Sequence, residues 1–562
     1  MSKVVLRSED SIAIDQFTGD VVDIIEELVE LLEDVFNGFY EKRCGEFLCN
    51  LVDHLFDEWL LKNLNPTMAE LTKIIIKEYN DENDIEAIEI NLLRELSDLP
   101  NFRDIVTEII ANKRKGENIN IHIRSFIYRL LEDKIQVFIY QTAIQFICRY
   151  LMLFVGIDKG AWKSIETPKN ITNAFLRFYW IVRTEMTKAI PVIYNLNELD
   201  WIYISEPDRQ GLDSEATKIL YRYEDIININ LGRMYKKLNQ YDFSYVNSDI
   251  WKKVYQRILP KEEVNRLGFV NTPDEIVDVI LDMIDFKYDN PKLCKKIILD
   301  PACGSGTFLV NVLSRLIRHL ETDLECHISN NSANWEKEKS KLEIILENIY
   351  GIDINPFATF LTTINLVFML MDSYSSVRAK DPYFTLGLKI LTNDSLAGEY
   401  GRTMINGFEN ARRSEAIENM RKFSQLLKQE FDYVIGNPPW GTVLRGKLGP
   451  LGNDEKRSEY KERFKSATGK YDVYVLFMER GIELLKNGGI LCYITQVNYV
   501  SQDYGDGIKQ VIKDCGSLEI FVDLQKVGQY IFPQWTNYPA ITLFKKGVKQ
   551  GKIKLIEVVP RE

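Results

Sequence analysis

The sequence predicts an α/β protein in two parts: a mainly helical region over residues 1–245, then a Rossmann-like, doubly wound sheet domain over residues 246–562. The length of 562 residues exceeds what one hydrophobic core normally organises. In the first part, apolar residues recur at helical spacings of three and four. In the second part, short apolar runs alternate with helical stretches, which is typical of a mainly parallel sheet.

The first part shows its helical pattern most clearly at 21–36 and 124–155. We find no internal repeat and no low-complexity tract in it. Two interpretations stay open for this region. It is either a helical domain that binds a partner or surrounds DNA, or a scaffold that carries no chemistry.

Composition is that of an ordinary globular protein, with 45% hydrophobic and 27% charged residues. No segment approaches the ~20 apolar residues of a membrane span. The best run, 146–157, is short and contains Arg149. The N-terminus lacks the apolar core of a signal peptide. We therefore expect a cytoplasmic protein without a membrane partner.

Eight scattered cysteines form no C-x-x-C pair, and four histidines are dispersed, so we expect reduced thiols and no bound metal. The net charge of −12 argues against a basic surface as a whole. It leaves nucleic acid open as a partner, because a local basic patch decides such binding.

The second part contains seven predicted strands. They are 296–300, 348–353, 388–394, 431–437, 488–496, 518–524 and 539–546. Doubly wound sheets bind ligands at the carboxyl ends of their strands. The residues that follow each strand are therefore the candidates for a functional site.

The first strand runs into DPACGSG, which holds Asp300, Pro301, Ala302, Gly304 and Gly306. The glycines allow a tight turn and a close approach to a ligand, and the helix that follows points its amides at that ligand. A purely structural turn explains the glycines about equally well. The motif G-x-x-x-x-G-K-[ST] is absent, which argues against a triphosphate-binding loop.

Acidic side chains follow the next two strands. Asp353 suits a ribose diol, or else caps the helix before Pro356, and Asp394 suits an adenine amino group. Upstream, Thr272 and Pro273 predict the N-cap and first position of a helix, whose N-terminus can hold a carboxylate. Together these positions indicate a nucleoside-bearing cofactor without a pyrophosphate requirement.

The fourth strand, FDYVI at 431–435, stops abruptly in Gly-Asn-Pro-Pro-Trp. Two prolines end backbone pairing, and an aromatic residue stands where the chain should turn into solvent.

These motifs resemble those of a known family. NTPDEIV, DPACGSGTFL, GIDINP, LTND, NPPW and YIFPQWTNYPAITLF occur in the order found in the gamma arrangement of adenine-N6 DNA methyltransferases, over about 246–562. Type I, type IIG and BREX-like modification methylases are of this kind. The resemblance implies a methyltransferase sheet with S-adenosylmethionine as cofactor. The implied cofactor-binding residues are Thr272, Pro273, Asp300, Pro301, Ala302, Gly304, Gly306, Asp353, Asp394 and Asn437.

The same resemblance implies site-specific methylation of adenine N6 in double-stranded DNA. That nitrogen is a poor nucleophile, so two acceptors must stabilise its developing charge: the amide oxygen of Asn437 and the main-chain carbonyl of Pro438. Pro439 stiffens the turn. Trp440 stacks on the flipped base, and Phe532 contacts the base from another side.

The stretch 445–470 carries eight Lys or Arg against four acids. We expect phosphate contacts from Lys456, Arg457 and Lys461, and a solvated loop explains the composition equally well. No target-recognition domain is visible, so either the chain is truncated or a specificity subunit reads the sequence. Restriction or defence-complex subunits are further candidate partners.

Two other functions remain open. A protein-glutamine or RNA-base methyltransferase also uses Asn-Pro-Pro-aromatic. A partner-dependent, DNA-binding subunit of a phage-defence complex is the non-enzymatic alternative. The charged stretch 319–347 carries no functional signal.

Overall fold

The structure is a computed structural model that describes most of the chain. The residues outside the description are 1–2, 8, 41–55, 58, 61–67, 81–83, 98, 100, 163–213, 247–249, 252–253, 255–256, 258–271, 323–332, 398–419, 441–453, 534–537, 550 and 561–562. The motif residue Asn271 and the first part of the basic stretch, up to residue 453, therefore lie outside the described residues.

An eight-stranded sheet forms the centre of the second part. Its strands are β3 (Ile298–Asp300), β4 (Ile349–Asp353), β5 (Lys389–Thr392), β6 (Phe431–Gly436), β7 (Leu485–Gln496), β8 (Gly516–Asp523), β9 (Pro539–Lys546) and β10 (Lys554–Glu557). All seven predicted strands are present. The edge strand β10, which pairs with β8, was not predicted.

The strand order is β10-β8-β9-β7-β6-β3-β4-β5, and β9 runs antiparallel to both of its neighbours. From β3 the chain passes to β4 and β5 on one side, and then returns to β6 and β7 on the other. The sheet therefore has its topological switch point between β3 and β6, where ligands bind in such folds. This arrangement confirms the predicted doubly wound sheet.

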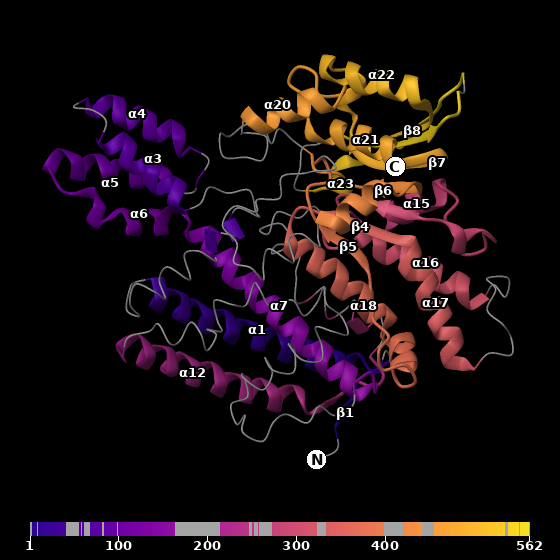
Figure 1. The fold of residues 1–562 in the computed structure, drawn as a ribbon, viewed down its shortest axis with the longest axis horizontal. Coiled ribbons are helices and arrows are strands. Elements are labelled where there is room, and N and C mark those ends of the chain that lie inside the picture. Colours follow the sequence, from indigo (N-terminus) through magenta and orange to yellow (C-terminus); the bar gives the residue numbers. More distant parts are fainter. Residues whose placement is uncertain are drawn as a thin grey trace.

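Helices cover both faces of the sheet (Figure 1). Those of the second part are α15 (Asp274–Met283), α16 (Thr307–Thr322), α17 (Asn334–Asn348), α18 (Pro356–Arg378), α20 (Asp454–Arg463), α21 (Val473–Leu484), α22 (Asp506–Cys515) and the short α23 (Gly528–Ile531). Tyr433 and Ile435 of β6 face the hydrophobic cluster of α15, α16 and α18, whereas Val434 between them faces the cluster of α21 and α22. A central strand buried on both faces reads as a mainly apolar run, and in β6 only Asp432, which pairs with Lys296, interrupts it.

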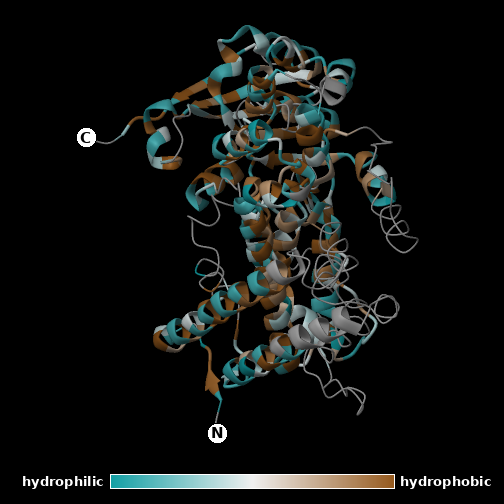
Figure 2. Ribbon diagram, turned by 90° about the vertical axis from the view of Figure 1, so that its left-hand side faces the viewer, coloured by the Kyte–Doolittle hydropathy of each residue, from teal (hydrophilic) through white to brown (hydrophobic). Residues whose placement is uncertain are grey.

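The first part is helical in its described residues. Its elements are α1 (Ser11–Tyr40), α3 (Met68–Asn80), α4 (Ile85–Glu95), α5 (Phe102–Lys115), α6 (Ile123–Leu130), α7 (Glu132–Asp158) and α12 (Ser214–Leu238), with a two-residue pairing of β1 (Val4–Val5) and β2 (Tyr241–Asp242). Figure 1 shows α3 to α6 as a separate group of helices, while α1 packs against both α7 and α12, and α7 runs beside α18. Both views place the N-terminus at the opposite end from the sheet (Figure 2).

The two parts meet where α7 packs against α18. The guanidinium of Arg149 lies 4.9 Å from the centre of the Phe360 ring, and Lys159 pairs with Asp372. One hydrophobic cluster contains buried residues from both sides of this contact. The division at 245/246 remains a prediction about organisation, but the described residues of the two parts share a core.

Two helices, α7 and α18, are long and apolar enough to cross a membrane. Their most apolar windows are 89% and 83% buried inside the protein, respectively. A helix that is hydrophobic all round and covered by other elements is a core helix. We therefore assign both helices to the protein interior.

Candidate active site

The turn after β3 is shaped by glycine. Asp300 ends the strand and is buried, and its Oδ1 accepts a 3.0 Å hydrogen bond from the Ala302 amide. Gly306 has a φ of +94°, and a Cβ there would lie 2.9 Å from Oγ1 of Thr362. Only glycine combines this backbone conformation with this close contact.

Helix α18 holds the same turn in place. Thr362 donates a 2.7 Å hydrogen bond to the Gly304 carbonyl, and Asn365 donates a 3.1 Å hydrogen bond to the Ser305 carbonyl. Residues three apart lie on one helix face, so α18 supports the turn with two adjacent side chains. Sequence analysis missed both residues, and the neighbouring Thr359 and Thr363 leave no pattern that would have singled them out.

Asp353 joins the end of β4 to this turn. Its Oδ2 accepts a 2.9 Å hydrogen bond from the Gly304 amide, and its Oδ1 accepts a 2.8 Å hydrogen bond from the Asn355 amide. The alternative that Asp353 caps the following helix is wrong. Asn355, which stands directly before Pro356 at the start of α18, is the N-cap of that helix. Its side chain accepts a hydrogen bond from the Phe357 amide.

Asp300 and Asp353 together give the site its electrostatic character. Burial, together with the charge of the nearby Asp353, raises the pKa of Asp300 to about 8, although the hydrogen bond from the Ala302 amide lowers it. Burial also raises the pKa of Asp353. The turn 300–306 contains no Lys or Arg. Two desolvated carboxyl groups suit a cationic ligand, such as an ammonium or sulfonium, and disfavour a pyrophosphate.

The residues around Asp394 connect the third strand end to the first. Ser395 donates a 2.6 Å hydrogen bond to the Pro301 carbonyl. Oδ1 of Asp394 accepts a 3.0 Å hydrogen bond from the Leu396 amide. The structure thus brings the residues predicted after β3, β4 and β5 to one edge of the sheet.

Asn437 follows β6 at the same edge. Gly436 before it has a φ of +147°, and a Cβ there would lie 2.6 Å from Oδ1 of Asp300. The Asn437 side chain donates from Nδ2 to Oγ1 of Thr272 over 3.1 Å. Its Oδ1 is buried and has no hydrogen-bond partner in the described part of the chain. Pro438 is buried, while Pro439 is exposed.

The expected capping role of Thr272 is wrong. Helix α15 begins at Asp274 with Pro273 as its N-cap, and no side chain makes a capping bond. The Thr272 hydroxyl instead accepts a hydrogen bond from Asn437. Thr272 is buried, and this bond satisfies its hydroxyl. The prediction that Pro273 occupies the first helical position is also wrong by one residue, because Pro273 is the N-cap.

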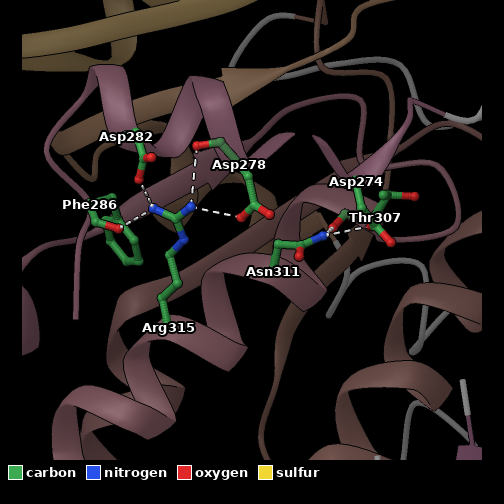
Figure 3. A network of polar contacts seen from close by, with 7 residues as sticks. All are labelled: Asp274, Asp278, Asp282, Phe286, Thr307, Asn311 and Arg315. Atoms are coloured by element: carbon green, nitrogen blue, oxygen red, sulfur yellow. Dashed lines mark hydrogen bonds and ion pairs between the residues drawn. The ribbon is translucent and has the colours of Figure 1, made fainter. Parts of the chain in front are cut away.

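A polar network fixes α15 on α16 (Figure 3). The Arg315 guanidinium donates 2.7 Å bonds to the carboxylates of both Asp278 and Asp282. Asn311 donates a 3.0 Å bond to Asp274 in the first turn of α15. Because α16 continues from the glycine turn, this network sets the position of Thr272 relative to that turn.

An aromatic pair lies beside Asn437. The rings of Trp440 and Phe532 meet edge to face, with their centres 5.0 Å apart and their planes at 79°. Phe532 is 4% exposed, and Nε1 of Trp440 is buried without a partner among the described residues. The structure therefore brings together the two aromatic residues that sequence analysis assigned to the base.

The basic residues predicted for phosphate contact lie on α20. Lys461 is exposed. Lys456 and Arg457 belong to the same helix, and their side chains lie outside the described residues.

Comparison with known proteins shows which family part of this site is similar to. Residues 347–532 match the family model described as Eco57I restriction-modification methylase. This part of the chain is therefore similar to restriction-modification methylases. It includes Asp353, Asp394, the Asn-Pro-Pro-Trp turn and Phe532.

Parts of two curated proteins are similar to this chain. The chain is 27% identical over 346 residues to the type II restriction enzyme and methyltransferase RM.Eco57I of Escherichia coli, covering 56% of this chain and 33% of that protein. It is 25% identical over 264 residues to the adenine-specific methyltransferase PglX of Streptomyces coelicolor, covering 42% and 20% respectively. The chain thus spans a third or less of both relatives.

One solved structure is similar along nearly the whole chain. It is the methyltransferase subunit of a type I restriction-modification system from Streptococcus thermophilus, at 10% identity and a TM-score of 0.41, covering 96% of this chain and 90% of that one.

Proposed function

We propose that the chain transfers a methyl group from S-adenosylmethionine to N6 of an adenine flipped out of double-stranded DNA. It would act as the site-specific modification enzyme of a restriction-modification or related phage-defence system. The observation that carries the proposal is the orientation of Asn437. The side-chain nitrogen of Asn437 donates a hydrogen bond to Thr272, and the buried side-chain oxygen of Asn437 has no hydrogen-bond partner among the described residues.

A buried acceptor without a partner costs about 1–3 kcal/mol. A site that keeps one is suited to receive a donor, and an exocyclic amine is such a donor. An acceptor placed against that amine stabilises the positive charge that develops as nitrogen attacks. The main-chain carbonyl of Pro438 is the second acceptor in the proposal, and the turn of two prolines restricts its movement.

The residues around the glycine turn fit the cofactor. Asp300, Asp353 and Asp394 would hold its cationic and hydroxyl-bearing groups, and Gly304 and Gly306 leave room for its close approach. When bound, S-adenosylmethionine supplies a methyl group on a sulfonium as the electrophile. Trp440 and Phe532 would enclose the flipped base, since a base–aromatic stack is typically worth ~1–3 kcal/mol.

Adenine as the target is supported by the named activity of the Streptomyces coelicolor relative and by the order of the sequence motifs. DNA, a recognition domain or specificity subunit, and further restriction or defence subunits are the proposed partners. A cytoplasmic location follows from this function.

The test is tritiated methyl transfer to DNA by the purified chain, with and without the products of neighbouring genes. Nucleoside mass spectrometry of the product should show N6-methyladenine. Asn437→Ala should keep cofactor affinity and abolish transfer, because its acceptor acts mainly in the transition state. Label found on cytosine, RNA or a protein glutamine, or full turnover by the variant, would refute the proposal.

A further inference from the structure

Helix α20 contacts the cofactor side of the site through Tyr460. The Tyr460 hydroxyl donates a 3.1 Å hydrogen bond to Oδ2 of Asp394. Only 4% of Tyr460 is exposed. Burial is the main cause that raises the pKa of Tyr460, and the charge of Asp394 is the second. The hydroxyl therefore keeps its proton at neutral pH. The carboxylate of Asp394 is therefore held from two sides, by Tyr460 and by the Leu396 amide.

Two consecutive residues of α21 fasten the segments on either side of this bond. Glu479 accepts hydrogen bonds from the amides of Lys465 and Ser466, at 3.0 and 2.7 Å, directly after α20 ends. Nε of Arg480 donates a 2.8 Å hydrogen bond to the Ser395 carbonyl, and the guanidinium also donates a hydrogen bond to the Ala397 carbonyl. Each of the two charged residues is 5% exposed.

Buried charges of this kind are retained where they are fully used in hydrogen bonds. Glu479 and Arg480 thus hold the end of α20 and the loop after Asp394 on one rigid helix. The Tyr460 hydroxyl completes the connection between the two held segments. The next residue, Lys461, points outward and is exposed, so α20 has one side in the cofactor site and another available to solvent.

We propose that Tyr460 is a positioning residue of the cofactor site, which ties α20 to Asp394 so that cofactor binding fixes α20. The proposal rests on the proposed role of Asp394 in holding the cofactor. Because linkage is reciprocal, any ligand that fixes α20 from its outer side also tightens cofactor binding. Tyr460 carries no motif that would have separated it from the other residues of SEYKERF, and sequence analysis missed it.

The test compares Tyr460→Phe with Tyr499→Phe. Tyr499 is a matched control because it is similarly buried, at 2% exposure, and its hydroxyl bonds Thr542 rather than the site. We expect Tyr460→Phe to weaken S-adenosylmethionine binding about three- to tenfold in calorimetry, which is the usual worth of one hydrogen bond. Tyr499→Phe should change the affinity less than about twofold.

Hydrogen exchange supplies the second measurement. The cofactor should slow amide exchange in α20 of the wild type and of Tyr499→Phe, and should not do so in Tyr460→Phe. Exchange in α22 serves as the internal check that each variant is folded. Asp394→Asn, which keeps the size of the side chain, should likewise remove the cofactor's protection of α20.

Wild-type affinity together with wild-type protection of α20 in Tyr460→Phe would overturn the inference. Failure of the proposed function gives a different result. If the wild type binds the cofactor and protects α20 through Tyr460 but transfers no methyl group to DNA, the inference stands and the proposed substrate is wrong.

Discussion

The side-chain nitrogen of Asn437 donates a 3.1 Å hydrogen bond to the hydroxyl of Thr272, a residue 165 positions earlier in the chain. An amide can present either its oxygen or its nitrogen to a ligand. In the structure the nitrogen faces Thr272, and the oxygen is buried without a hydrogen-bond partner among the described residues. A side-chain hydrogen bond therefore links the Asn-Pro-Pro-Trp turn to the residue that precedes the Pro273 cap of α15.

Loss of that hydroxyl should impair turnover more than cofactor binding. We expect Thr272→Val to lower the single-turnover rate about tenfold or more at saturating cofactor and DNA, because the Asn437 amide is then free to turn its nitrogen toward the base. Thr272→Ser keeps the hydroxyl and should remain near the wild-type rate. Equal rates for the Val and Ser variants would show that Thr272 does not orient Asn437.

Asp353→Ala should weaken S-adenosylmethionine binding more than tenfold in calorimetry. The change removes the proposed ribose acceptor and also the partner of the Gly304 amide, so the glycine turn loses support. Asp523→Ala is the control, since Asp523 also ends a strand and its carboxylate accepts from the Gln525 amide in its own turn. Unchanged affinity in Asp353→Ala would remove Asp353 from the cofactor site.

Asp300 should make stability depend on pH. Its folded pKa of about 8 lies above the ordinary value of 3.8 for an aspartate, so the folded state holds a proton that the unfolded state has lost across that window. Stability contributed by this group is therefore present at low pH and is lost as pH rises toward 8.

The side chain of Asp300→Asn cannot titrate. The melting temperature of the variant minus that of the wild type should therefore increase from about pH 4 to pH 8, and this difference should stay constant at higher pH. Differential scanning calorimetry at several pH values measures the gain, which we expect to reach a few degrees. The same variant should bind S-adenosylmethionine more weakly. A constant difference in melting temperature from pH 4 to 8 would contradict the raised pKa.

Trp440→Ala should reduce the fraction of flipped base, because the variant cannot form a stack worth ~1–3 kcal/mol. Fluorescence of 2-aminopurine at the target position reports this fraction. Trp440→Tyr keeps an aromatic face and should retain most of the signal. Flipping that is equal in the Ala and wild-type proteins would assign Trp440 to packing against Phe532 alone.

The chain alone should bind duplex DNA weakly and with little sequence preference. Charge reversal at Lys456, Arg457 and Lys461 should weaken binding to every sequence alike and lower the salt dependence, by about 0.9 in slope for each phosphate that the protein no longer neutralises. Reversal of Lys549, Lys552 and Lys554 near the edge strand β10 is the matched control. Tight, salt-resistant binding to one motif would instead indicate that the helical first part reads sequence.

The sequence allowed the strands and the strand-end residues to be predicted because both follow local rules. Apolar runs such as FDYVI mark strands that are buried on two faces, and parallel strands bring their carboxyl ends to one edge. Asp300, Asp353, Asp394 and Asn437 therefore meet as expected.

Contacts between distant segments followed no such rule. The Thr272 hydroxyl fits a helix cap equally well by pattern, and only the folded chain shows that Asn437 uses it. Tyr460, Thr362 and Asn365 act through partners that are far away in sequence. The edge strand β10 was missed because its mostly exposed residues lack the apolar alternation of a half-buried strand.

The packing of α7 on α18 has a consequence for how the molecule unfolds. Helix α18 supports the glycine turn with Thr362 and Asn365 on one side, and contacts α7 on another. A fragment that begins at residue 246 would expose to water the apolar face of α18 that packs against α7. Exposed apolar patches promote aggregation. Both halves should accordingly melt in one cooperative transition, and loosening of the N-terminal helices would reach the glycine turn of the candidate site through helix α18.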